Sequence, residues 1–272
     1  MDASAYDRSD LIVLDEVGST NIELLERAAA GAGHGTALRA RVQTSGRGRR
    51  AHSWASPDGG LYLSILLRAP IPARVLPGLP VACGLGVLRA LEEAGASGLS
   101  LKWPNDIVSA DGKLGGILVE ARANSSETIA VCGIGINYHA PRRIERVDGA
   151  LPVSSLDDCL RASPLPGHDD LARSIRARVL ETTDDWRGAI EQADADAAPL
   201  TGIVDAYNER LAYRGRCVRA VSPDGATIAT GTFTGVDLGG CARLLTAAGK
   251  MASFDSVDAS LRPVDAQAFT TL

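Results

Sequence analysis

The segment GRGRRAHSWASPDGG, residues 46–60, gathers Arg47, Arg49 and Arg50 among glycines. Arg47 and Arg49 are two residues apart, so in an extended segment their guanidinium groups point the same way and can hold one phosphate or carboxylate. The glycines leave such a loop free to move. The segment predicts a local anion site, although a solvated basic loop or an RNA-binding segment fits the same residues.

A second polar cluster, KWPND, occupies residues 102–106 and follows a predicted strand. Pro104 keeps Trp103 out of helical geometry and leaves Asn105 and Asp106 at the end of the strand, where binding sites are often built. An ordinary Pro-Asn-Asp turn would contain the same residues. The cluster supports a site only in combination with other polar segments.

Two glycine pairs follow this cluster. Lys113 precedes Gly115 and Gly116, which places a cation beside backbone that a ligand can approach closely, although a surface hairpin would have the same sequence. Gly133 and Gly135 precede Asn137 but lack the third glycine and the following helix of a dinucleotide site.

Composition limits the class of ligand. The chain has 272 residues and a formal net charge of -5, so it has no general attraction for nucleic acid, and the arginines favour a small anionic molecule. We expect no membrane span, because no apolar run approaches the ~20 residues required. The first residues lack the pattern of a secretory signal, so we expect a cytoplasmic protein. Five widely spaced cysteines without a C-x-x-C pair predict neither a disulfide framework nor a zinc site.

The elements that must position these residues alternate between strands and helices as far as about residue 211. A Thr20–Glu23 capping box predicts a helix that begins at Thr20 and is closed by Gly31, and apolar spacing predicts a buried helix over residues 75–94. Residues 61–69, 99–103, 113–121 and 128–138 read as strands, of which the nearly continuous apolar ones are expected at the centre of a sheet. Together they predict a mixed sheet backed by helices.

Turn signals dominate the end of the chain. Pro-Asp-Gly at 223–225, Gly-Gly at 239–240 and Ala-Gly at 248–249 separate β-prone runs and predict a small antiparallel barrel. We place the boundary near residue 213, which gives domains of residues 1–212 and 213–272. Residues 141–167 are predicted as a long loop with at most a short helix.

GSTN, QTSGRGRR with a following Trp-x-Ser-Pro, KWPND, GKLGGIL and GIGIN, in this order, resemble the catalytic domain of biotin protein ligases. The resemblance covers roughly residues 11–140 and extends more loosely to the C-terminal barrel. It implies an α+β fold, with a catalytic domain like that of class II aminoacyl-tRNA synthetases and an SH3-like β-barrel. It also implies a two-step reaction, in which ATP activates biotin as biotinyl-5′-AMP and a lysine of a biotin carboxyl carrier domain then attacks the adenylate.

The resemblance further implies the site residues. The expected catalytic residues are Lys113, Arg49 and Arg47. The residues expected to bind biotin are Ser19, Thr20, Asn21, Gln43, Gly46, Arg47, Gly48, Arg49, Lys113, Gly115 and Gly116. The residues expected to bind the nucleotide are Arg49, Arg50, Trp54, Lys102, Asn105, Asp106 and Asn137, and Asp106 is also a candidate contact for the Mg²⁺ that accompanies ATP.

The chain departs from the family where GRGRR usually continues with glycine and then arginine or lysine. It has Ala51 and His52 there, so we expect weaker phosphate binding at the end of the loop. Because ten residues precede Leu11, we expect no helix-turn-helix and hence an enzyme that does not bind DNA. A homodimer is left open. The alternatives are a lipoate or octanoate ligase and a non-catalytic protein that binds a ligand or RNA.

Overall fold

A seven-stranded mixed sheet forms the larger part of the protein. The computed structural model describes residues 11–123, 127–139, 151–160 and 164–264. In sheet order the strands are β1 (Leu11–Val17), β2 (Ala37–Gln43), β3 (Leu61–Ala69), β7 (Thr128–Ile136), β6 (Gly112–Ala123), β5 (Asp106–Ser109) and β4 (Ser100–Lys102). β1 pairs with β2 in parallel and the other neighbours are antiparallel, which confirms the predicted mixed sheet. The apolar strands β3 and β7 lie at its centre, as predicted.

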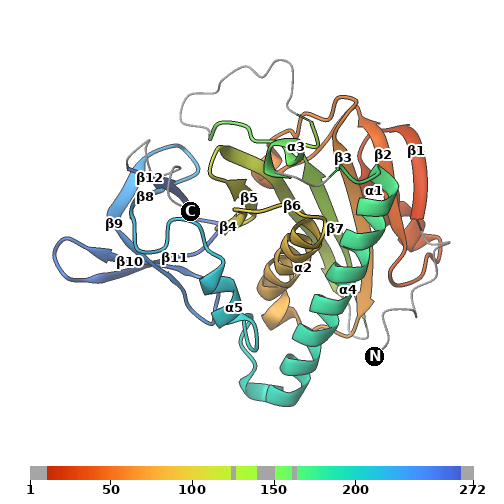
Figure 1. Ribbon diagram of the computed structural model, residues 1–272. Helices are drawn as coiled ribbons and strands as arrows, with labels where there is room; N and C mark the ends of the chain where they lie inside the picture. Colours follow the sequence, from red (N-terminus) through yellow and green to blue (C-terminus); the bar gives the residue numbers. More distant parts are fainter. Residues whose placement is uncertain (1–10, 124–126, 140–150, 161–163, 265–272) are drawn as a thin grey trace.

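Helices cover both faces of this sheet (Figure 1). Because side chains alternate along β3, Leu63 and Ile65 join the main core with helices α2 (Leu79–Glu93) and α4 (His168–Ala193). Leu66 faces the other way and packs with Leu24 of α1 (Thr20–Ala29) in a second, smaller core. The predicted sheet backed by helices is therefore confirmed, with α1 on the face opposite to α2 and α4.

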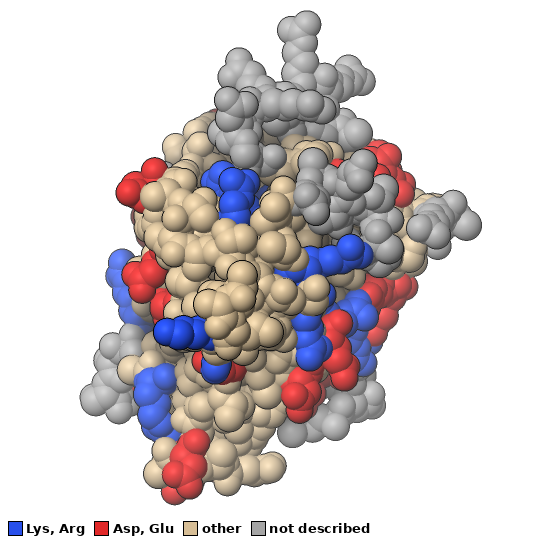
Figure 2. Space-filling model, turned by 90° about the vertical axis from the view of Figure 1, so that its left-hand side faces the viewer, with Lys and Arg blue, Asp and Glu red and all other residues tan. Residues whose placement is uncertain are grey.

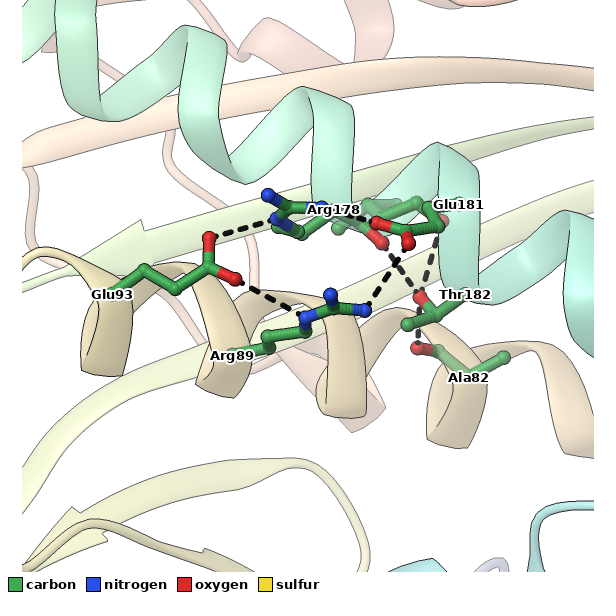
Figure 3. A network of polar contacts seen from close by, with 7 residues as sticks. Ala82, Arg89, Glu93, Arg178, Glu181 and Thr182 are labelled. Atoms are coloured by element: carbon green, nitrogen blue, oxygen red, sulfur yellow. Dashed lines mark hydrogen bonds and ion pairs between the residues drawn. The ribbon is translucent and has the colours of Figure 1, made fainter. Parts of the chain in front are cut away.

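The helices α2 and α4 approach each other closely at Gly86. A Cβ atom at Gly86 would lie 2.5 Å from Thr182 Oγ1, so a larger residue would push the helices apart. A set of charged side chains flanks this contact, as Figure 3 shows; it comprises Arg89, Glu93, Arg178 and Glu181, with the Thr182 hydroxyl donating to Ala82 O at 3.0 Å. Each such partly exposed pair adds at most about 1 kcal/mol, so the network mainly fixes how α4 is aligned along α2.

The start of α2 differs from the prediction. A short 3-10 helix, η4 (Ala73–Gly78), precedes it, and the α-helix begins at Leu79 instead of residue 75. Pro77 has no backbone N–H to donate, which explains why regular α-helical pairing starts after it. Among the described residues, the stretch Ala73–Glu93 is long and apolar enough to cross a membrane, contrary to our expectation. It is 67% buried, and its apolar character is explained by its position in the core.

The predicted capping box of α1 is wrong. Ser19, not Thr20, is the N-cap residue, and its side chain makes no capping hydrogen bond. The Thr20 hydroxyl instead donates to Gln43 Oε1 at the end of β2. The other end of the helix is as predicted, because Gly31 follows it with a φ of +100°, a conformation that suits glycine.

The C-terminal part is a five-stranded antiparallel sheet in the order β11-β10-β9-β8-β12. Its strands are β8 (Cys217–Val221), β9 (Thr227–Val236), β10 (Ala242–Thr246), β11 (Met251–Phe254) and β12 (Ser260–Pro263). Gly225, Gly240 and Gly249 each have a positive φ in the connecting turns, where the sequence predicts turns. These features agree with the predicted small SH3-like barrel. The domain boundary near residue 213, between α5 (Val204–Glu209) and β8, stays a prediction.

The segment between β7 and α4 is described only in part. Residues 140–150 and 161–163 of the predicted loop lie outside the described residues, as do the first ten residues on which the missing helix-turn-helix was predicted. The described part contains the four-residue helix α3 (Leu156–Cys159), in agreement with the prediction of at most a short helix. A further 3-10 turn, η5 (Asp194–Asp196), follows α4.

Candidate active site

A cleft of about 290 Å³ lies over strands β6 and β7 of the large sheet and reaches Ser260 of the C-terminal barrel. It is bordered by the start of α1, the end of β2, the segment after it, the β4–β5 turn, β6, β7 and the first residue of β12. Its lining residues include most of the predicted site: Ser19, Thr20, Asn21, Gln43, Arg47, Gly48, Arg49, Arg50, Trp54, Lys102, Asn105, Asp106, Lys113 and Gly116. Motifs that are far apart in the sequence therefore share one cleft.

One side of the cleft is a floor of neutral polar groups. Gln43 Oε1 accepts hydrogen bonds from the Thr20 backbone N–H at 2.9 Å and from its hydroxyl at 3.1 Å. Gln43 Nε2 donates to Ser56 Oγ at 2.8 Å, and Asn21 Oδ1 accepts from Ser64 Oγ at 2.6 Å. Thr20, Asn21 and Ser64 are almost fully buried, and buried polar groups keep fixed positions when they are paired in this way. The floor is a rigid arrangement of donors and acceptors.

The opposite side of the cleft carries a carboxylate between two ammonium groups. Asp106, the first residue of β5, lies 3.1 Å from Lys102 Nζ through one oxygen and 2.6 Å from Lys113 Nζ through the other. Burial raises the pKa of Asp106, but the two lysines outweigh burial and lower the pKa to about 2. Asp106 is therefore charged at neutral pH. The cluster keeps a net positive charge at the position where the sequence predicts a nucleotide.

Trp54 lies between the floor and the lysine cluster. Lys113 Nζ is 5.1 Å from the centroid of its ring, within the range of a cation–π interaction. A Cβ atom at Gly135 would lie 2.6 Å from Trp54 Nε1, so only glycine lets the indole rest against β7. The Gly-x-Gly of β7, weak as a nucleotide motif, thus has a packing role. Asn105 uses its Nδ2 to donate to Ile117 O at 3.0 Å, which joins the β4–β5 turn to β6.

The arginines of the GRGRR segment point to different partners. Arg47 Nη1 lies 2.9 Å from Glu120 Oε1. Arg49 Nη2 donates to Ser256 O at 2.6 Å, and Arg50 Nη2 donates to Ser256 O at 2.8 Å and to the neighbouring carbonyl Val257 O. The two guanidinium groups thus have different partners here, and the short helix η3 (Arg49–Ala51) interrupts the extended segment. Both arginines line the cleft, and their binding of one anion stays a prediction.

The barrel therefore contacts the predicted anion loop directly. The carbonyls that accept from the two arginines belong to the turn between β11 and β12, and Ser260 next to it lines the cleft. Burial, and next the charge of Arg50, lower the pKa of Arg49, which nevertheless stays protonated. Arg50 has a φ of 54°, an uncommon conformation for a side chain other than glycine. The face of the molecule on the barrel side is mostly uncharged, with small separate groups of Lys and Arg (Figure 2).

Three predicted site residues do not line the cleft. Asn137 Nδ2 donates to Lys113 O and Ser154 O, both at 3.1 Å, and so holds the first residues of β6 in place from behind. A Cβ atom at Gly46 would lie 2.3 Å from Trp54 O, and one at Gly115 would lie 2.6 Å from Gly135 O. The two glycines allow close backbone contacts around the cleft, and Asn137 supports β6.

The sequence reasoning missed some residues at the cleft. Ser260 lines it, and Ser56 and Ser64 complete the polar floor. His52, which the sequence analysis related to phosphate binding, also lines the cleft. Glu120 was missed as well, although it carries a charge in an apolar strand and shares a face with Gly116. That position in an alternating strand was the available signal. Two carboxylates, Asp106 and Glu120, pair with three of the five cations of the cleft, which therefore keeps an excess of positive charge.

No group of three or more His, Cys, Asp or Glu side chains in the described ranges could hold a metal ion. Asp106, the predicted Mg²⁺ contact, has both oxygens in ion pairs with lysines. Mg²⁺ is commonly bound through one or two carboxylates together with substrate phosphates. Each oxygen of Asp106 keeps a lone pair beyond its lysine contact, so the carboxylate fits a single contact to Mg²⁺ bound by a nucleotide.

Comparisons with known proteins agree with this geometry. Residues 15–137 match the model of the Biotin/lipoate A/B protein ligase family. The chain is 34% identical over 227 residues to a biotin–[acetyl-CoA-carboxylase] ligase of Mycobacterium tuberculosis, which covers 80% of this chain and 77% of that protein. It is 31% identical over 243 residues to the ligase of the same name from Paracoccus denitrificans, and the match covers 88% of this chain and 95% of that protein.

Solved structures extend the likeness to the whole fold. The biotin protein ligase of Aquifex aeolicus in complex with biotin and ATP has a TM-score of 0.74 and 29% identity, and the match covers 94% of this chain and 99% of that one. The similarity therefore includes both the seven-stranded sheet and the C-terminal barrel. The chain belongs to the biotin protein ligase family.

Proposed function

We propose that this chain activates biotin with ATP to biotinyl-5′-AMP and transfers the biotinyl group to a lysine of a biotin carboxyl carrier domain. The observation that carries the proposal is that a polar floor and a cluster of five cations line the same cleft. The floor offers neutral donors and acceptors to a polar ring, while the cations face the end at which two anions must meet. The names of the related ligases support the same reaction.

The biotin side of the cleft consists of Ser19, Thr20, Asn21 and Gln43. The side chains of Thr20, Asn21 and Gln43 already hydrogen-bond one another or the surrounding strands, so they are fixed before biotin enters. A ureido ring offers both N–H donors and a carbonyl acceptor, and a polar floor can satisfy these groups in an otherwise buried position. We assign biotin ring recognition to these four residues.

The cations stabilise the first chemical step. The biotin carboxylate attacks the α-phosphate of ATP, the bond between the α- and β-phosphates breaks, and the negative charge on the leaving pyrophosphate grows. Lys113, which lies between Trp54 and Asp106, is positioned to stabilise that charge. Arg47 is closest to the biotin side and is assigned to the carboxylate or the adenylate phosphate. Mg²⁺ bound to ATP would supply further neutralisation, with Asp106 as a carboxylate within reach.

Arg49 and Arg50 would act by moving. Their present partners are neutral backbone carbonyls of residues 256 and 257. A phosphate forms stronger, charge-assisted hydrogen bonds with guanidinium groups than a carbonyl does. We propose that nucleotide binding draws these arginines from the barrel turn onto the phosphates, and that the closed loop then keeps water from the reactive adenylate. Trp54 would stack on the adenine, next to Asn105 and Lys102.

The second step joins the acceptor lysine to biotin. The neutral amine of that lysine attacks the biotinyl carbonyl carbon, and AMP leaves with the electron pair of the bond that breaks. The loop must open on one side to admit the amine, which agrees with a segment held by a few hydrogen bonds to the barrel. We also propose a cytoplasmic location and no binding of DNA, on the basis of the net charge of -5 and of a barrel-side face on which small groups of Lys and Arg are interspersed with Asp and Glu (Figure 2). A homodimer remains open to measurement in solution.

Exchange of labelled pyrophosphate into ATP with a panel of acids tests the first step. We expect exchange with biotin and at most weak exchange with lipoate or octanoate, because an apolar acid has no polar ring that could hydrogen-bond to the floor. A streptavidin blot of carrier domain, enzyme, biotin and Mg-ATP tests the second step. Equal exchange with octanoate would favour the lipoate-type alternative, and no exchange with any acid would favour a protein that only binds ligands.

A further inference from the structure

Glu120 connects the two halves of the cleft, although the sequence reasoning gave it no role. It lies on β6, and its two carboxylate oxygens serve different partners. Oε1 is 2.9 Å from Arg47 Nη1, and Oε2 accepts a hydrogen bond from Asn21 Nδ2 at 2.9 Å. One side chain therefore joins Asn21 of the polar floor to Arg47 of the GRGRR segment.

Asn21 has every polar atom of its amide in use. Its Nδ2 carries two protons, which go to Leu118 O at 3.3 Å and to Glu120, while its Oδ1 accepts from Ser64 Oγ. The side chain is also confined by Gly133, since a Cβ atom there would lie 2.3 Å from Asn21 Oδ1. Asn21 is thus fixed in position, and it fixes Glu120 in turn.

Arg47 depends on its contact with Glu120 for a fixed position, whereas Asn21 has other partners that hold it. The Arg47 side chain is 46% exposed, and Glu120, which is 24% exposed, is the carboxylate that pairs with it in the described part of the chain. A long, half-exposed side chain without such a partner would sample many rotamers, and substrate binding would then have to order it. The pair holds the guanidinium next to the floor before any substrate arrives.

We propose that Glu120 is a positioning residue that acts through Arg47. It holds the guanidinium group of Arg47 next to the polar floor, in the position where that group contacts the carboxylate of bound biotin. This inference rests on the proposed function. It assigns Glu120 no contact with substrate. The gain is preorganisation, because the arginine is already oriented when biotin binds and less entropy is lost on the way to the transition state.

Glu120→Gln is the sharpest test, because glutamine has nearly the same shape but a single oxygen. Both partners of Glu120 are donors, so one of them must face the amide NH₂ of the new side chain. Asn21 is buried and cannot turn to water, whereas Arg47 can. The oxygen should therefore stay with Asn21 and release Arg47. We expect kcat/KM for biotin in pyrophosphate exchange to fall about tenfold while KM for ATP changes by less than roughly twofold.

A double-mutant cycle separates positioning from a general structural role. If Glu120 acts through Arg47, Glu120→Gln should cause no further loss in an Arg47→Ala background, although it costs about tenfold alone. Glu23→Gln is the matched control, since it breaks another Glu–Arg pair, with Arg27 at 2.8 Å, away from the cleft. Equal losses with and without Arg47, or wild-type kinetics in Glu120→Gln, would overturn the inference. Absence of exchange in the wild type would instead refute the proposed function.

Discussion

Replacing Asp106 with asparagine tests the electrostatic account of the cleft without any substrate. The carboxylate has a pKa of about 2 in place of its ordinary 3.8, because the neighbouring lysines outweigh burial. At about 1.4 kcal/mol for each tenfold change in the ionisation constant, this difference stabilises the folded protein by about 2 kcal/mol. Asparagine lacks the charge. We therefore expect Asp106→Asn to lower the free energy of unfolding by about 2 kcal/mol at pH 7.

The stability difference between wild type and Asp106→Asn should depend on pH in a defined direction. A carboxylate whose pKa is depressed in the folded state contributes its stability above the pKa of the unfolded chain and loses it as the pH falls through the folded pKa. The difference between wild type and Asp106→Asn should stay constant from pH 7 to about pH 4 and then shrink, to roughly half by pH 3. Urea unfolding followed by tryptophan fluorescence at several pH values measures it.

Asp111→Asn is the control for this experiment. Asp111 is an exposed acidic residue in the turn between β5 and β6, close to Asp106 in the sequence. Its replacement should change stability by less than about 0.5 kcal/mol. An Asp106→Asn protein as stable as wild type would show that burial cancels the attraction of Lys102 and Lys113. A deficit of equal size at pH 7 and pH 3 would show that the loss comes from packing and not from charge.

Three further changes probe the proposed chemistry. Lys113→Ala should reduce pyrophosphate exchange by about 100-fold or more with the fold retained by circular dichroism, because it removes a cation from the developing charge; rates within twofold of wild type would remove Lys113 from the mechanism. Trp54→Ala should weaken ATP binding in calorimetry by about 5- to 150-fold, the worth of one stacked base, and unchanged affinity would place adenine elsewhere. His52→Arg adds a permanent charge at the cleft and should slow the escape of preformed biotinyl-5′-AMP by about fivefold, whereas equal escape rates would show that residue 52 does not reach the phosphate.

Local sequence signals predicted the elements whose structure depends on local physics. Nearly continuous apolar runs located β3 and β7. The glycines of the C-terminal turns located the strands of the barrel, because positive φ values are a local requirement. The capping box at Thr20 failed for a non-local reason. Gln43, 23 residues away, competes for the Thr20 hydroxyl and wins, so Ser19 begins the helix without a side-chain cap.

The site residues also fall into those that local signals indicate and those that depend on contacts across the fold. Ends of strands are predictable, so Lys102, Asp106 and Lys113 were each singled out from the sequence, and the pairing of β4, β5 and β6 brings them into one cluster. Contacts across the fold were not predictable. Arg49 reaches Ser256, 207 residues further along the chain, and no pattern within the GRGRR segment indicates that partner. Asn137 was misplaced because an asparagine after a strand binds backbone as readily as ligand.

The partners of the cations indicate which part of the cleft responds first to a triphosphate. Lys102 and Lys113 share a charged carboxylate with little access to water, and an incoming phosphate must compete with the attraction of that carboxylate for both ammonium groups. Arg49 and Arg50 donate their hydrogen bonds, among the described residues, to neutral carbonyls of the barrel turn, and a phosphate forms stronger hydrogen bonds than a carbonyl does. The lysine cluster therefore provides the fixed part of the anion site. The arginines, released from residues 256 and 257, provide the part that closes over the substrate.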